Sequence, residues 1–272
     1  MSEKPIDEYS CRAITILKDE LFELYQGLGE FSDSLFLVGG LACDLLVKNK
    51  LPYLSEYLGT LDIDLAVRFV GSVSSAPESL YRMLRGLEFE RNMLSDGSDL
   101  MNHSFIKSDG QTRIELDLIA DARIPPVKDK LVEISPRVDA AKFKGVYLVF
   151  EDYLVRVIRK ADRQIGIKIP NIVPFITLKA FAYADEQRHD PKDAYDLWYS
   201  VANYGEGPES VIKELLRYRG NEDVKEARRI IKGIFAAETS SGTSDVCRIL
   251  TRRYNLGRAR ALNEVLMLFR RL

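Results

Sequence analysis

Short apolar runs bounded by polar residues fill most of the chain before residue 160. Runs at residues 35–38, 60–67 and 113–119 are rich in Leu, Ile and Val and predict buried strands. Residues 14–25 carry apolar side chains at helical spacing and predict an opening helix. Further strands are expected at 103–107 and 146–150, and a further helix at 78–87.

After Pro170 the pattern changes to long helical repeats, first at residues 175–188 and then at 191–203. Strand signals are rare from there to the last residue. We therefore expect an α/β (α+β) chain with a small mixed sheet flanked by helices in residues 1–160, followed by a mainly helical domain in 161–272.

Three aspartates lie on two of the predicted strands. Asp62 and Asp64 are two residues apart, so their carboxylates project to one face of the strand, and Asp117 lies on the strand at 113–119. Such a pair alone is typical of the solvated face of an edge strand, because acidic residues are mostly exposed. On a buried strand, neighbouring like charges need a divalent cation or a basic side chain to compensate them.

A diglycine upstream changes this interpretation. Gly39 and Gly40 end the apolar run at 35–38 and open a helix-compatible stretch at 41–47. Bare glycine backbone lets N–H groups meet a phosphate at a helix N-terminus. Because Asp62 and Asp64 lie on the next apolar strand, the diglycine and the aspartates together predict a phosphate-and-metal site.

The helical half contains a second group of charged residues. Helical spacing places Asp193 and Asp196 on one face, and Lys179 projects from the preceding predicted helix, with Arg188 after it. A solvated helix surface explains such charges in many proteins. Here Lys179 lies within an apolar run, and Asp196 is followed directly by Leu197, which favours half-buried and partnered charges.

Composition restricts the class of protein. Lys and Arg number 39 against 41 Asp and Glu, so no global charge indicates nucleic acid or membrane as a partner. The 3 cysteines are scattered and predict neither a disulfide framework nor a zinc site. Neither a signal sequence nor a membrane-length apolar run is present, so we expect a cytoplasmic protein. Basic residues gather at 248–272, in Arg248, Arg252, Arg253, Arg258, Arg260, Arg270 and Arg271.

Together these motifs resemble the nucleotidyltransferases of the DNA polymerase β superfamily, and within it the AbiEii toxin family. The resemblance covers residues 35–199 and rests on Gly39-Gly40, Asp62-x-Asp64, Asp117, Lys179-x-x-Ala182 and Lys192-Asp193-x-x-Asp196. It implies a polymerase β-like nucleotidyltransferase domain followed by a helical domain. It also implies Mg²⁺- or Mn²⁺-dependent transfer of a nucleotide from an NTP, and a paired antitoxin.

The resemblance also implies roles for individual residues. Asp62, Asp64 and Asp117 would bind the metal ions, and Asp117 would help an acceptor hydroxyl lose its proton. Glu115, on the same face as Asp117, is a weaker candidate ligand. The triphosphate would be bound by Gly39, Gly40, Lys179 and Arg188. Asp193 would orient Lys179 or a substrate group, and Asp196 is a weaker candidate for the same role.

The chain departs from the family pattern at two places. Many relatives have serine where Gly40 stands, so backbone N–H groups would replace a hydroxyl contact. Relatives also carry an arginine closer to Lys-x-x-Ala than Arg188, and another where this chain has Asp190. Either Arg188 replaces one or both of these arginines, or the chain binds the triphosphate in a different way.

The motifs leave the acceptor open. An RNA end, above all that of tRNA, would use the basic stretch at 248–272 for phosphate contacts, with Tyr204 or Tyr254 stacking on a base. A protein side chain and a small hydroxylated molecule are the alternative acceptors, and the basic stretch narrowly favours RNA. A catalytically silent module that binds a nucleotide or a partner is the rival from another class, and the full set of carboxylates argues against it.

Overall fold

The computed structural model describes residues 11–69, 80–93, 97, 100–108, 112–188 and 190–272; the side chains of Cys11 and Arg12 are not described. The chain forms two compact units. We call residues 12–42 and 60–170 the sheet unit, and residues 43–59 and 171–272, with Cys11, the helical unit. The expected limits of 1–160 and 161–272 differ from these units, because residues 43–59 group with the helices and residues 161–170 with the sheet.

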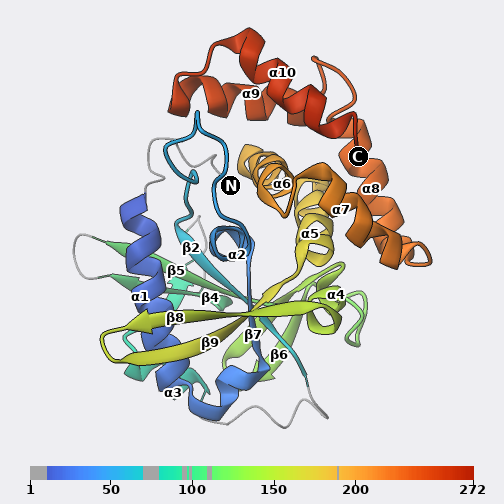
Figure 1. Cartoon of the computed structure of the whole chain (residues 1–272). Helices are drawn as coiled ribbons and strands as arrows, with labels where there is room; N and C mark the ends of the chain where they lie inside the picture. The colour runs from blue at the N-terminus through green and yellow to red at the C-terminus, as the bar shows by residue number, and fades with distance from the viewer. Residues whose placement is uncertain (1–10, 70–79, 94–96, 98–99, 109–111, 189) are drawn as a thin grey trace. The chain divides into compact units, whose positions relative to one another are not determined.

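A seven-stranded mixed sheet forms the centre of the sheet unit (Figure 1). Its main path runs β1-β2-β5-β4-β3, and β7 pairs with both β5 and β6. β2 and β5 are parallel, whereas β1 pairs with β2 and β4 pairs with β5 in antiparallel register. The predicted mixed sheet flanked by helices is thus confirmed. The strands are β1 (Leu35–Val38), β2 (Asp62–Val67), β3 (Glu90–Met93), β4 (Leu100–Ser108), β5 (Arg113–Asp121), β6 (Leu131–Ser135) and β7 (Val138–Phe143).

A separate two-stranded hairpin, β8 (Tyr153–Lys160) with β9 (Arg163–Pro170), completes the sheet unit. β9 runs beside β1, and the ion pair between Lys160 and Glu23, at 2.9 Å, joins the hairpin to the first helix. The helices of the sheet unit are α1 (Cys11–Gly27), the short 3₁₀ helix η2 (Gly29–Ser34), α3 (Leu80–Gly86) and α4 (Val146–Glu151), together with the start of α2 (Gly39–Leu46).

The strand predicted at 146–150 is wrong, because these residues form α4. Gly145 precedes the helix with φ +85°, a left-handed conformation that turns the chain sharply. Val146 and Val149 are buried three positions apart, which is helical spacing. A short apolar run without alternation does not distinguish a strand from a buried helix. The helix predicted at 78–87 is present as α3 from Leu80, and residues 78 and 79 lie outside the described part.

Helices make up almost all of the helical unit. Three of them begin at side-chain caps: the Asn171 carboxamide oxygen accepts from the N–H of Ile172, the Asp190 carboxylate from the N–H of Lys192, and the Asn221 carboxamide oxygen from the N–H of Val224. α5 packs against α6 and α8, and α6 packs against α9. The helices are α5 (Ile172–Ala184), α6 (Pro191–Asn203), α7 (Pro208–Leu215), the 3₁₀ helix η4 (Leu216–Tyr218), α8 (Glu222–Ile234), α9 (Ser241–Tyr254) and α10 (Arg258–Phe269).

α5 is shorter than predicted. It ends at Ala184, so Arg188 lies in the turn that follows rather than on the helix. Among the described residues, none of the helices combines the length and the apolar composition needed to span a bilayer.

Candidate functional site

Carboxylates from two neighbouring strands share one face of the large sheet. On β2, Asp62 and Asp64 alternate with Ile63, which is fully buried on the opposite face. The parallel register pairs Asp62 with Glu115 and Asp64 with Asp117 on β5. Because paired residues on adjacent strands point to the same face, all four carboxylates lie on one face of β2 and β5.

Gly39 lies in close contact with this group. Its φ of +67° is in the left-handed region, and a Cβ placed on it would lie 1.8 Å from Oδ2 of Asp64. Only glycine fits there. Gly39 and Gly40 also open α2, where the first backbone N–H groups have no partner within the helix. The structure therefore places helix N-terminal donors next to an aspartate of the candidate site.

Two residues on β4 and β3 support Asp117 and Glu115, and neither of them was predicted from the sequence. Ser104 pairs with Asp117 across β4 and β5, and its hydroxyl donates to the carboxylate. Asn92 on β3 donates to Ser104 Oγ, at 3.2 Å, and to Glu115 Oε1, at 2.7 Å. Neither the run around Ser104 nor the run around Asn92 alternates in a way that indicates these contacts.

The remaining oxygen of Asp117 has no protein partner. Oδ1 is buried and accepts no hydrogen bond from the described residues. Burial, followed by the charge of Asp64, raises the pKa of Asp117 from 3.8 to about 7. A buried carboxylate oxygen without a donor is a position that a cation would stabilise.

These residues fit a hard divalent cation by their chemistry, because carboxylate oxygens are the ligands that Mg²⁺ and Mn²⁺ prefer. Among the described residues, no three Asp, Glu, His or Cys side chains are already gathered as a metal-ligand group. Like charges on one face repel one another, so compensation is needed to draw them together. The unpartnered Oδ1 of Asp117 and the contact between Gly39 and Asp64 are the observations that support the fit.

The charged residues of the helical unit form a buried network. Lys179 on α5 contacts Asp193 at 2.7 Å and Asp196 at 2.6 Å, both on α6. Lys192 also contacts Asp196, at 2.8 Å, and Arg188 lies 3.6 Å from Asp193. Asp196 is completely buried and Lys179 is 7% exposed. The solvated helix surface considered from sequence is therefore excluded for this pair.

Burial and pairing act in opposite directions on these groups. Burial alone would lower the pKa of Lys179, but Asp193 and Asp196 raise it above its ordinary value. Burial alone would raise the pKa of Asp196, but Lys179 and Lys192 hold it below its ordinary value. Both side chains are thus kept charged inside the unit.

The predicted site residues therefore form two groups, one in each unit. Gly39, Gly40, Asp62, Asp64 and Asp117 lie together in the sheet unit. Lys179, Arg188 and Asp193 lie together in the helical unit.

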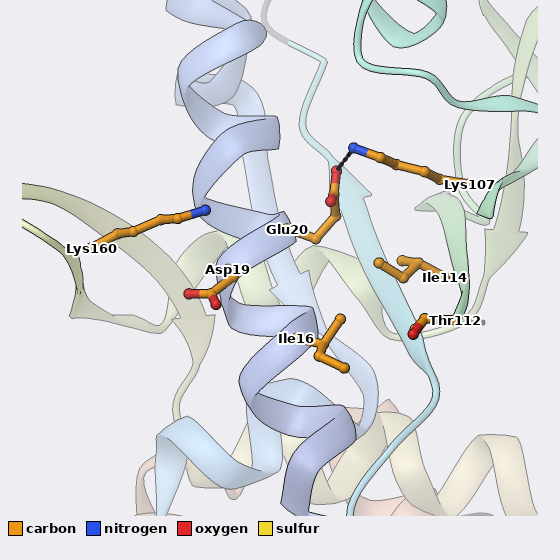
Figure 2. Close-up of a pocket in the computed structure, with 7 residues that line it drawn as sticks. All are labelled: Ile16, Asp19, Glu20, Lys107, Thr112, Ile114 and Lys160. Carbon is orange, nitrogen blue, oxygen red and sulfur yellow. Dashed lines mark hydrogen bonds and ion pairs between the residues drawn. The ribbon is translucent and has the colours of Figure 1, made fainter. Parts of the chain in front are cut away.

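Two cavities of the sheet unit are lined by other residues. Figure 2 shows one of about 170 Å³, where Lys107 reaches Glu20 of α1 at 2.9 Å. Its lining comprises Ile16, Asp19, Glu20, Lys107, Thr112, Ile114 and Lys160. The other, of about 240 Å³, includes the ion pair of Asp121 with Arg123, at 2.8 Å, and the ring of Tyr147. None of the predicted site residues lines either cavity.

A protein-family profile matches residues 28–245, which include every residue of both groups. The family is described as the nucleotidyl transferase AbiEii toxin of type IV toxin–antitoxin systems. The chain belongs to the AbiEii family. It is accordingly an NTP-dependent nucleotidyltransferase, and membership in a toxin–antitoxin family implies an antitoxin partner. Neither a curated protein nor a solved structure matches the chain significantly.

Proposed function

We propose that this AbiEii protein transfers an NMP from an NTP to an acceptor hydroxyl with the help of Mg²⁺ or Mn²⁺ bound by Asp62, Asp64 and Asp117. The supporting observation is the shared face of β2 and β5, on which Asp64 and Asp117 are register partners and Asp117 Oδ1 has no donor among the described residues. When bound, the metal would neutralise charge that develops at the phosphates.

The chain's own residues supply the rest of the reaction. Asp117 accepts the proton of the acceptor hydroxyl as general base. The hydroxyl oxygen then attacks the α-phosphorus, the bond to the bridging oxygen breaks, and pyrophosphate leaves. Backbone N–H groups at Gly39 and Gly40 donate to the triphosphate as it approaches the start of α2.

In this proposal Lys179 and Arg188 are the cations that bind the triphosphate. Lys179 is kept positively charged by its two carboxylate partners, and Asp193 fixes its direction through a 2.7 Å hydrogen bond. Arg188 is the more accessible cation, since its side chain is 39% exposed. Guanidinium and ammonium groups are the usual protein partners of phosphate oxygens.

For the acceptor we propose an RNA end, such as that of tRNA. Arg252, Arg258 and Arg270 are exposed and make no ion pair within the described residues. Other arginines of the C-terminal stretch are paired, such as Arg248 with Asp245 at 3.1 Å and Arg271 with Glu209 at 3.0 Å. Exposed, unneutralised arginines are suited to phosphate contacts.

The tyrosines proposed for base stacking are less accessible than expected. Tyr254 is half-buried, stacks on Tyr195 and donates to the Glu56 carbonyl at 2.9 Å. The Tyr204 hydroxyl donates to Asn171 at 3.0 Å. The RNA proposal therefore rests on the arginines and not on these rings.

Transfer of radiolabel tests the proposed function. The purified protein is incubated with each α-³²P-labelled NTP, Mg²⁺ and total RNA, and RNA is separated from protein on a denaturing gel. Asp62→Asn should lower the rate of transfer roughly 100-fold or more, as expected when a metal ligand is removed. Asp129→Asn, at an exposed position remote in sequence from both groups, is the matched control and should transfer normally.

The acceptor follows from where the label appears. Label on RNA that disappears in Asp62→Asn supports the RNA proposal and identifies the donor nucleotide. Label on protein instead identifies a protein modifier, and transfer only to an added small hydroxylated molecule rules out RNA. Full activity of Asp62→Asn would contradict the metal assignment.

A further inference from the structure

A loop between α2 and β2 is bonded to the helices of the helical unit at several points. The Lys50 N–H donates to the Asn203 side chain of α6 at 2.6 Å, and the Tyr53 hydroxyl donates to Glu264 of α10 at 2.8 Å. At Glu56 the backbone carbonyl accepts from Tyr254 of α9. Residues 50–57 are therefore fixed at both ends and in the middle.

Tyr57 is a buried residue of this loop. Its side chain is 4% exposed, and its ring lies against Tyr195 and Tyr199 of α6, with centroid distances of 6.0 and 5.0 Å. Its hydroxyl donates to Asp196 Oδ1 at 2.6 Å and accepts from Lys192 Nζ at 3.1 Å. Burial and the charge of Asp196 raise the pKa of Tyr57 well above its ordinary value, so the hydroxyl keeps its proton.

The contact with Tyr57 completes the hydrogen bonding of Asp196. Oδ1 accepts from the Tyr57 hydroxyl, while Oδ2 meets Lys179 at 2.6 Å and Lys192 at 2.8 Å. Because Asp196 is completely buried, water does not replace a lost donor. Without the Tyr57 hydroxyl, we expect the Asp196 carboxylate to rotate toward the two lysines and the Lys179 ammonium to shift with it.

We propose that Tyr57 is a positioning residue that fixes the Lys179 ammonium through Asp196 and thereby sets the affinity for the triphosphate of the donor. The inference rests on the proposed function, in which Lys179 meets the triphosphate. A residue that only fills space would act through its ring, whereas this role needs the hydroxyl. Tyr57→Phe separates the two, because it keeps the ring and removes the donor.

The test compares nucleotides with and without the outer phosphates. Dissociation constants for each of the four NTPs and for the matching NMPs are measured by calorimetry on the full-length protein. Tyr57→Phe should weaken binding of the preferred NTP about 10-fold, the range for a hydrogen bond to a charged group. It should change NMP binding less than about twofold, because an NMP lacks the phosphates that Lys179 contacts.

Two further variants show whether the effect passes through Lys179. In a Lys179→Met background, adding Tyr57→Phe should change NTP affinity less than about twofold, because the positioned group is already absent. Tyr53→Phe is the matched control, since it removes a hydroxyl from the same loop without touching the network, and it should bind like the wild type. Replacing Tyr57 with p-aminophenylalanine, which keeps an N–H donor, should restore NTP affinity and covers the case in which Tyr57→Phe folds poorly.

Each outcome bears on a different statement. Equal losses for NTP and NMP, full additivity with Lys179→Met, or no rescue by p-aminophenylalanine would overturn the positioning role of Tyr57 and leave the proposed function standing. A wild-type protein that binds none of the NTPs would overturn both.

Discussion

Gly39→Ala is the most direct test of the geometry of the sheet unit. The backbone at Gly39 is left-handed, which costs an alanine about 1 kcal/mol. The new Cβ would also lie 1.8 Å from Asp64 Oδ2, so one of the two must move by roughly 1 Å or more. Together we expect a loss of about 3 kcal/mol in the free energy of unfolding.

The catalytic cost should be larger than the loss of stability suggests. A displacement of roughly 1 Å at a reacting group is enough to lower a rate by about 100-fold. Gly39→Ala should therefore lose transfer by about 100-fold while remaining folded at the assay temperature. Urea unfolding and label transfer measured on the same preparation separate the two effects.

Gly29→Ala is the matched control. Gly29 also has a left-handed φ, +53°, but no atom lies within 4 Å of the position where its Cβ would be. It should lose only about 1 kcal/mol and keep normal transfer. In the double variant Gly39→Ala with Asp64→Ala, the stability loss should fall toward that of Gly29→Ala, because the obstructing oxygen is gone. If Gly39→Ala and Gly29→Ala behave alike in both assays, the reasoning from the close contact is refuted.

Three further predictions concern charge. In metal-free buffer the wild-type protein should lose stability as the pH rises from about 4 through about 7, because folding raises the pKa of Asp117. In thermal unfolding, Asp117→Asn should be about 2 kcal/mol more stable than the wild type at pH 8 and nearly equal to it at pH 4. Lys179→Met should lose about 3–5 kcal/mol in chemical denaturation, because it leaves two buried carboxylates short of a cation. Replacing Arg252, Arg258 and Arg270 with Ala should lower the slope of log affinity for single-stranded RNA against log salt by about 2 in filter binding.

The outcomes that contradict these predictions are equally specific. An Asp117→Asn variant with the same pH dependence as the wild type would show that Asp117 does not titrate near neutrality. A loss of less than about 1 kcal/mol in the free energy of unfolding of Lys179→Met would show that the charged network is exposed to solvent. An unchanged salt slope in the triple arginine variant would remove the C-terminal stretch from RNA binding.

Four strands of the sheet unit, β1, β2, β4 and β5, were predictable because their signals are local, whereas β3, β6 and β7 were not predicted. The buried strand β1 matches the predicted run at 35–38, and the period-2 alternation of Asp62 and Asp64 indicated their common face before the register was known. The helices α5 and α6 were predictable from apolar periodicity, and Pro191 at the first position of α6 marked its start.

The contacts that sequence did not reveal join residues far apart in the chain. Tyr57 and Asp196 are 139 positions apart, and no local pattern links a loop tyrosine to a helix carboxylate. The β8–β9 hairpin was also missed, since its alternation is interrupted by basic residues and Gly166. Both cases depend on tertiary packing, which propensity and periodicity do not encode.

The assignment of residues 43–59 to the helical unit has a consequence for how such genes can recombine. A crossover near the codon for Pro170 would replace α5 to α10 but keep the original segment that contains Tyr57. The new α6 would then pack on a loop that evolved with a different set of helices. The equivalents of Asp196 and Asn203 would face side chains from that other loop. Successful exchanges among relatives should therefore carry two separated pieces of the gene, and the segment between the diglycine and the aspartates should share its ancestry with the C-terminal helices.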